Sequence, residues 1–139
     1  MAVTVALEEL HTELGRNGHS SLRPVHGYAL NAVLNGHHTA SALAPLLAMT
    51  KQGAARVVQH LVDEGYLSHG TDADARRKAL VLTERGHEVV RLSVQVQERI
   101  EGEWAELAGR REMAAVRRVL ESAVRHRAGT SEPPLRRGW

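Results

Sequence analysis

The chain of 139 residues has no cysteine. Disulfide bonds, thiolate zinc sites, iron–sulfur clusters and cysteine nucleophiles are therefore excluded. Aromatic residues make up only 3% of the sequence, with no phenylalanine, which argues against the stacking platforms that bind single-stranded nucleic acid. Charge of one sign is not in large excess either, because 18 lysines and arginines stand against 16 aspartates and glutamates. We expect a core of leucine, valine and alanine.

Asp, Glu, Lys and Arg are also missing from one long stretch, Pro24 to Thr50. That length is enough to span a bilayer, but Asn31, Asn35 and Gly36 lie in its middle, where a membrane helix is most apolar. The chain does not open with a basic segment followed by an apolar one, which is the pattern of an export signal. We therefore expect no membrane partner and a location in the cytoplasm.

The length fits one globular domain, which we expect over residues 1–128. Residues 129–139 combine glycine, adjacent prolines and adjacent arginines with little to bury, so we expect a disordered tail. The sequence has no Gly-x-Ser-x-Gly elbow, phosphate-binding loop or His-Glu-x-x-His motif. It therefore predicts a protein that is not an enzyme and that needs no cofactor.

Apolar residues recur at three- and four-residue spacing through most of the chain, which predicts helices. The first helix is expected over about residues 2–15, and the second from Pro24 to Asn35. A third begins at Thr39 or Ser41. It is expected to be short or bent, because Pro45 removes one backbone donor.

A fourth helix is predicted between Thr50, which suits an N-cap, and Gly65, which suits a terminator. Its apolar stripe is Ala54, Val57, Val58 and Leu61. Its opposite side presents Lys51, Gln52, Ala55 and Arg56. Two helices joined by a short turn, the second with a basic outer face, indicate a helix-turn-helix. The same pattern also fits two ordinary core helices in a small bundle.

The segments 67–69 and 78–82 alternate with a period of two and enclose a polar, charged loop, which predicts a hairpin. A hairpin directly after a helix-turn-helix is typical of a winged helix, whose hairpin, the wing, reaches along the DNA backbone or into a minor groove. Arg76 and Arg77 are placed for that contact. A merely solvated loop is the alternative interpretation of the same charges.

At this point the residues resemble the MarR family of bacterial transcriptional regulators. The stretch Asp74–Gly86 fits the family's Asp-x-Arg, then apolar-x-Leu-Thr-x-x-Gly pattern at every anchor. Residues 39–44, 49–52 and 61–67 match the family's helix, turn and helix-to-wing segments, so the resemblance covers about Leu22 to Leu92. The sequence departs from the family's usual residue types at Gly27, His38 and Pro45.

The resemblance implies a mostly helical fold with a small β-wing. A winged helix-turn-helix lobe of about residues 22–83 would bind DNA, and helices from both chain ends, about 2–15 and 84–127, would form a dimerisation module. The helices from the two chain ends carry more apolar positions than one small lobe can bury, which favours a dimer. A monomer in which these helices fold back on the lobe is the alternative. By resemblance, the residues facing the major groove are Thr50, Lys51, Gln52, Ala55 and Arg56. Arg76 would insert into the minor groove, with Asp74 holding the wing.

Residue chemistry agrees with these roles. Phosphates would be contacted by Lys51, Arg56, Arg76, Arg77 and Lys78, so affinity should fall steeply with salt. Gln52 suits a bidentate contact to adenine, and Arg56 suits guanine or phosphate. We therefore expect a sequence-specific regulator of double-stranded DNA, a repressor by family default, acting as a homodimer on a pseudopalindrome. A winged helix that only contacts protein is the alternative.

The resemblance also implies a small-molecule effector, with a pocket between the dimer helices and the lobe. The candidate lining is His11, Arg23, His26, Gly27 and Tyr28. The alternative is that neighbouring side chains fill the space left by Gly27, so that no pocket exists. The nine histidines raise a further hypothesis, a metal-responsive regulator, against the simpler interpretation of scattered surface histidines. We assign no metal ligand from the sequence.

Overall fold

The computed structural model describes residues 2–70 and 79–128 of the chain. Its elements in chain order are α1 (Ala2–Arg16), α2 (Pro24–Leu34), α3 (Ala40–Leu46), α4 (Lys51–Asp63), β1 (Leu67–His69), β2 (Leu80–Leu82), α5 (Glu84–Ala108) and α6 (Arg110–Ala128). A mostly helical protein with a small antiparallel sheet confirms the expected fold class. The expected tail, 129–139, lies outside the described residues, as does the segment 71–78.

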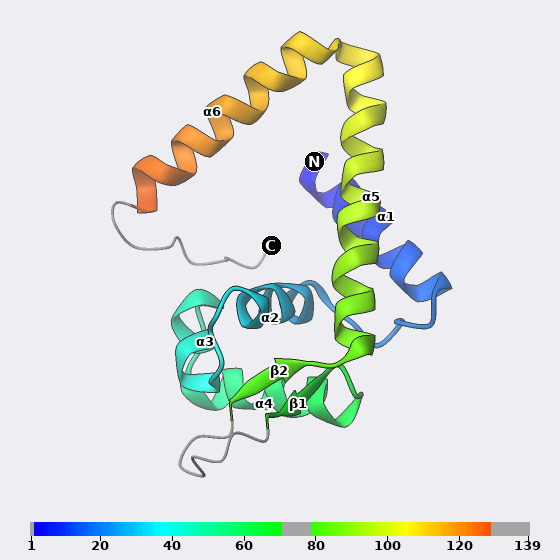
Figure 1. The fold of residues 1–139 in the computed structure, drawn as a ribbon. Helices are drawn as coiled ribbons and strands as arrows, with labels where there is room; N and C mark the ends of the chain where they lie inside the picture. Colours follow the sequence, from blue (N-terminus) through cyan, green and yellow to red (C-terminus); the bar gives the residue numbers. More distant parts are fainter. Residues whose placement is uncertain (1, 71–78, 129–139) are drawn as a thin grey trace.

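The elements form a lobe and a helical arm (Figure 1). α2, α3, α4 and the sheet make the lobe at one end of α5, and α1 packs along α5. α6 leaves the other end of α5 after Gly109, whose φ of 99° breaks the helix. Within the described part of the chain, none of the helices has the length and apolarity needed to cross a bilayer.

Local sequence explains where α3 begins and why it is short. Thr39 is its N-cap, and the Thr39 hydroxyl accepts a hydrogen bond from the Ala42 backbone N–H at 3.1 Å. Pro45 lies inside the helix, which spans only 7 residues. The expected effect of Pro45, a short third helix, is confirmed.

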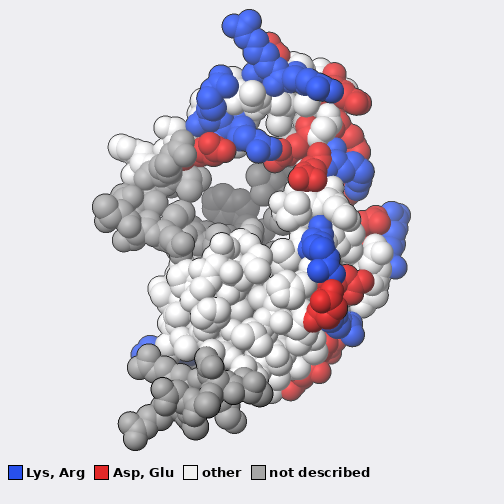
Figure 2. All heavy atoms as spheres, viewed as in Figure 1, with Lys and Arg blue, Asp and Glu red and all other residues white. Residues whose placement is uncertain are grey.

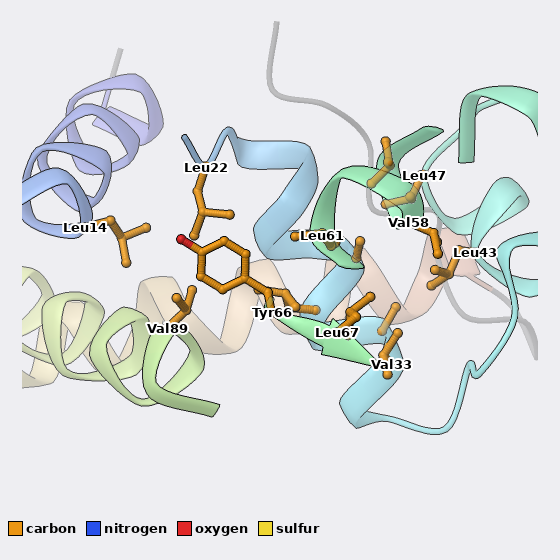
Figure 3. Packing of buried hydrophobic residues seen from close by; sticks show 14 of the residues in the cluster. Leu14, Leu22, Val33, Leu43, Leu47, Val58, Leu61, Tyr66, Leu67 and Val89 are labelled. Carbon is orange, nitrogen blue, oxygen red and sulfur yellow. The ribbon is translucent and has the colours of Figure 1, made fainter. Parts of the chain in front are cut away.

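The hydrophobic core runs from α1 and α5 into the lobe. Leu43, Leu61 and Tyr66 are fully buried, and Figure 3 shows the Tyr66 ring close to Leu22 and Val89. Leucine, valine and alanine dominate this core as expected, with Tyr66 as its large aromatic member. Because Tyr66 follows α4 and Val89 lies in α5, this packing fixes the lobe against the arm.

Charge is distributed unevenly over the surface. Figure 2 shows acidic and basic side chains along the arm and a largely uncharged face over the lobe. α2 and α3 contain no Asp, Glu, Lys or Arg, because they come from the stretch of the sequence that lacks these four residue types. α5 is tied to α1 by an ion pair between Arg99 and Glu9, with the Nη1 and Oε1 atoms 2.7 Å apart.

Candidate nucleic-acid interface

A tight turn sets the angle between α3 and α4. The Met49 N–H donates to the Ala44 carbonyl at 2.9 Å and the Ala48 N–H to the Pro45 carbonyl at 3.2 Å, which is the hydrogen-bond pattern of a Schellman motif. This motif requires a left-handed residue, and Ala48 takes that role with φ 51°. Two short helices joined in this way confirm the helix-turn-helix geometry expected from the sequence.

The N-terminus of α4 is built by Thr50. The Thr50 hydroxyl accepts a hydrogen bond from the Gly53 N–H at 3.1 Å, so one orphan donor of the first turn is satisfied. A side chain at position 53 would be crowded, because a Cβ on Gly53 would lie 3.4 Å from both Met49 Cβ and Thr50 Oγ1. Glycine at position 53 thus keeps side-chain atoms away from Met49 and Thr50 in the first turn of α4.

α4 has one buried face and one exposed face. Ala54, Val57, Val58 and Leu61 are buried against the core. The side chains that the family resemblance assigns to the major groove are all exposed: Thr50, Lys51, Gln52, Ala55 and Arg56. Neither Lys51 nor Arg56 forms an ion pair with any acidic residue that the structure describes. Their positive charges are thus available to an anionic partner.

The sheet forms the base of the wing. β1 and β2 pair antiparallel with Leu67 opposite Leu82 and His69 opposite Leu80, and the Gly70 N–H donates to the Ala79 carbonyl at 2.7 Å. The remaining wing residues assigned to DNA, Asp74, Arg76, Arg77 and Lys78, lie outside the described residues. The structure thus supplies the hairpin's two strands and their register.

Thr83 joins the wing to both neighbouring helices. Its hydroxyl donates to the Gly65 carbonyl at 2.6 Å and accepts from the Gly86 N–H at 3.1 Å. The first bond reaches the segment just after α4, and the second caps α5. One side chain therefore sets the end of the candidate recognition helix relative to the arm.

Sequence reasoning missed a polar cluster around Tyr66, the buried residue that follows α4. The Tyr66 hydroxyl lies 3.1 Å from His19 Nδ1 and accepts from Arg85 Nη2 at 3.2 Å, while the Arg85 guanidinium sits 4.7 Å above the Tyr66 ring. Burial lowers the pKa of His19, although nearby Glu88 opposes that shift. These residues are far apart in sequence, so no local pattern indicates the cluster.

The structure contains a cavity of about 230 Å³ between α1, α2 and α5. Most of its lining is apolar, from Leu7, Leu10, Leu14, Leu22, Val89 and Val90. Of the residues suggested by the sequence, His11, Arg23, Gly27 and Tyr28 line it. Burial lowers the pKa of His11, and its Nε2 is buried without a hydrogen-bond partner among the described residues.

His26 is not part of that lining. It is buried, its ring stacks on His60 with centroids 4.5 Å apart, and its Nδ1 accepts from the Arg23 N–H at 3.0 Å. Burial, followed by the nearby His60, lowers the pKa of His26 to about 4. His26 thus acts as a neutral capping and packing residue of α2. The described residues include no group of three or more histidines and carboxylates arranged to hold a metal ion.

Comparisons with known proteins agree on one fold. Residues 20–78 match the model of a family described as the MarR family. Among solved structures, Rv1404 from Mycobacterium tuberculosis is similar at 20% identity and a TM-score of 0.72, covering 94% of this chain and 86% of its own. Rv2887, a MarR family protein of the same organism, is similar in its DNA complex, at 19% identity, TM-score 0.67 and coverage of 88% and 90%.

The same Rv2887 protein in complex with salicylic acid is similar at 18% identity, with a TM-score of 0.66 and coverage of 88% of this chain and 90% of that one. At sequence identities of 18–20%, the similarity to these solved structures shows the fold alone. No curated protein sequence matches the chain.

Proposed function

We propose that this chain, whose residues 20–78 match the MarR family model, is a DNA-binding transcriptional regulator of the MarR type, and that it recognises a specific pseudopalindromic duplex as a homodimer and represses transcription from it. The observation that carries the proposal is the outer face of α4. Its N-terminal turns are exposed, polar and basic, and neither Lys51 nor Arg56 pairs with a described acidic residue. An α-helix of this kind fits the width of a major groove.

Each residue of that face has a distinct role in the proposal. Lys51 neutralises phosphates, which releases counterions and makes affinity fall with salt. Gln52 reads adenine through a bidentate contact, and Arg56 contacts guanine or phosphate. Family resemblance and charge assign the wing residues Asp74, Arg76, Arg77 and Lys78 to the DNA interface as well. This assignment is supported by the base of the wing, which follows α4 directly and has a fixed register between β1 and β2.

A homodimer is supported by apolar surface on the arm. Large apolar side chains are exposed on the three helices of the arm: Val5 of α1, Val94 and Leu107 of α5, and Val116, Val119 and Leu120 of α6. Leu107 is 87% exposed in the single chain. Burying this surface against a second copy is favourable. A two-fold dimer then presents two α4 helices about 34–36 Å apart, one duplex turn.

We further propose that a small amphipathic acid occupies the cavity between α1, α2 and α5. Apolar walls suit its carbon skeleton, while Arg23 and the unpartnered Nε2 of His11 offer polar contacts. Rv2887 binds salicylic acid, so salicylate is the probe of choice. Because the cavity lies between the arm and α2 of the lobe, a ligand that prefers one arrangement shifts the spacing of the two α4 helices.

Selection of bound duplexes from a random pool tests the proposed function. We expect an enriched inverted repeat with half-sites one turn apart, and a steep loss of affinity between about 50 and 200 mM salt. Arg56→Ala should weaken binding, whereas Arg91→Ala, an exposed arginine of α5 paired with Glu84, should not. Absence of any enriched duplex would leave a protein-contact module as the better account.

The effector proposal has its own matched variant. A Cβ on Gly27 meets no atom within 4 Å, so Gly27→Leu should fold and fill the cavity. Salicylate should raise the melting temperature and release the duplex from the unaltered protein but not from Gly27→Leu. Equal responses of the two proteins would place the ligand elsewhere.

A further inference from the structure

The second strand of the wing has an outer edge that the first strand does not cover. Gly70 and Ala79 form a hydrogen-bonded pair of the antiparallel ladder, so the next pair, His69 and Leu80, is a non-hydrogen-bonded one. The N–H and C=O of Leu80 therefore point away from β1. They face the loop that joins α2 to α3.

A single residue of that loop, His38, meets both groups. The Leu80 N–H donates to the His38 carbonyl at 2.8 Å, and His38 Nδ1 lies 2.9 Å from the Leu80 carbonyl oxygen. A carbonyl oxygen only accepts, so Nδ1 must carry the hydrogen of the second bond. Both the neutral Nδ1–H tautomer and the imidazolium provide that hydrogen. The backbone supplies one bond and the side chain the other.

The loop that presents His38 is itself held on both sides. Before it, the His37 N–H donates to the Ala32 carbonyl of α2 at 3.0 Å. After it, Thr39 caps α3 through its hydroxyl. His38 is therefore a fixed point of the lobe, and β2 is secured between β1 and this point.

We propose that His38 is a positioning residue that holds the wing for DNA binding. The inference rests on the proposed function, which it deepens. Arg77 precedes Leu80 by three residues, and three residues of chain reach at most about 10 Å. Fixing both backbone groups of Leu80 consequently limits where the wing's arginines can go. A wing that is already placed loses less conformational entropy when it meets the duplex.

Substitutions of His38 that remove or keep the side-chain hydrogen-bond donor test the proposal. Alanine removes the Nδ1 donor, and leucine removes it while keeping an apolar side chain of similar size. Asparagine carries an amide nitrogen at the same number of bonds from Cα as Nδ1, so His38→Asn can restore the bond. The backbone bond from Leu80 to residue 38 remains in all three variants.

Affinity for the selected duplex is the first measurement. His38→Ala and His38→Leu should bind about 3- to 10-fold more weakly, the effect of losing one hydrogen bond at an exposed position, and His38→Asn should come within about 2-fold of the unaltered protein. Equal affinities of all four proteins would overturn the proposal. So would a failure of His38→Asn to recover any of the loss.

A double-mutant cycle shows whether His38 acts through the wing. In an Arg76→Ala, Arg77→Ala background, His38→Ala should cost less than half of its original fold-change on a logarithmic scale, because the groups it positions are gone. An undiminished loss in that background would assign His38 a general structural role and refute the positioning role.

Nuclear magnetic resonance of the protein alone separates this inference from the proposed function. The nitrogen shifts of His38 should report the Nδ1–H tautomer, and the Leu80 amide should exchange faster in His38→Ala while core amides of α5 keep their rates. An Nε2–H tautomer would overturn the anchor even if DNA binds. Anchoring without binding to any duplex would instead overturn the proposed function, and with it the role of His38 in DNA affinity.

Discussion

Ala48 shows how one residue sets the geometry of the candidate interface. Among the non-glycine residues that the structure describes, Ala48 alone has a positive φ, at 51°, and it closes the turn between α3 and α4. α2 and α4 end with the same pair of backbone hydrogen bonds, but there Gly36 and Gly65 occupy the left-handed position. Alanine at this position places its Cβ close to a carbonyl oxygen, so the turn stores strain.

Ala48→Gly should therefore stabilise the protein. The left-handed conformation destabilises the folded state with alanine by about 1–2 kcal/mol, and glycine relieves this strain. Glycine also makes the unfolded chain more flexible, which offsets about 0.5–1 kcal/mol of the gain. We expect a net gain of about 0.5–1 kcal/mol and a melting temperature higher by about 2–4 °C. Gly65→Ala, at φ 75°, is the opposite control and should melt lower. A lower melting temperature for Ala48→Gly would contradict the strain.

At the scale of elements, the contact between α5 and the wing's base depends on Gly86. A Cβ built on Gly86 would lie 2.3 Å from the Tyr66 carbonyl oxygen, a backbone atom that cannot rotate away. The same carbonyl accepts from the Thr83 N–H at 3.1 Å. The Thr-x-x-Gly pattern seen in the sequence thus has a steric cause: α5 approaches the Tyr66 backbone, just before β1, too closely for any side chain.

Gly86→Ala should destabilise the protein by about 1–3 kcal/mol, because α5 must shift away from the Tyr66 backbone. Gly102→Ala is the matched control in the same helix, since its Cβ meets no atom within 4 Å. That control should gain about 0.5–1 kcal/mol from helix propensity. Urea midpoints of the two variants measure the contrast, and similar midpoints would mean that α5 and β1 separate at little cost.

α2 should make folding sensitive to acid. Burial, then His60, Arg23 and His11, lowers the pKa of His26 to about 4, whereas the same side chain in the unfolded chain has the usual histidine pKa of about 6.5. The unfolded state therefore binds more protons between these values. The free energy of unfolding is highest above pH 6.5 and falls as the pH drops towards 4, by roughly 3 kcal/mol from this residue.

His26→Asn tests that pH dependence. Asparagine offers an oxygen that can accept from the Arg23 N–H but has no titration in this range. The variant should lose part of the decline in melting temperature between pH 6.5 and 4. The decline caused by His11 and His19 should remain, since burial lowers their pKa as well. An unchanged pH profile would show that His26 does not titrate as proposed.

At the scale of the whole molecule, the single chain leaves an apolar surface on its arm. α6 packs against α5, while Val116, Val119 and Leu120 stay exposed along one face of α6. In Figure 1 this helix runs back from the end of α5 without resting on the lobe. That arrangement is explained if a second copy covers the exposed face.

Val119→Asp combined with Leu120→Asp should convert the proposed dimer into a monomer, because two buried carboxylates without partners would oppose association. Sedimentation equilibrium should report the change, and duplex affinity should fall with it. Ala114→Asp is the control, since residue 114 is exposed on the opposite face of α6. A double variant that still sediments as a dimer would move the interface away from α6.

The sequence by itself determined what depends on neighbours a few residues away. Helical spacing, the caps Thr39 and Thr50, the short α3 around Pro45 and the polar face of α4 are all local features, because capping and periodicity act within one or two turns. Family resemblance supplied the arrangement of those elements. The two strands of the wing followed from their period of two.

Tertiary structure alone decided the rest. His38 and Leu80 meet across 42 positions, and His19 and Tyr66 meet across 47. His26, placed by the sequence beside a cavity, stacks on His60 instead, because packing between α2 and α4 buries its ring. Contacts of this kind form only when distant segments pack, and no spacing within either segment encodes which partner it will find.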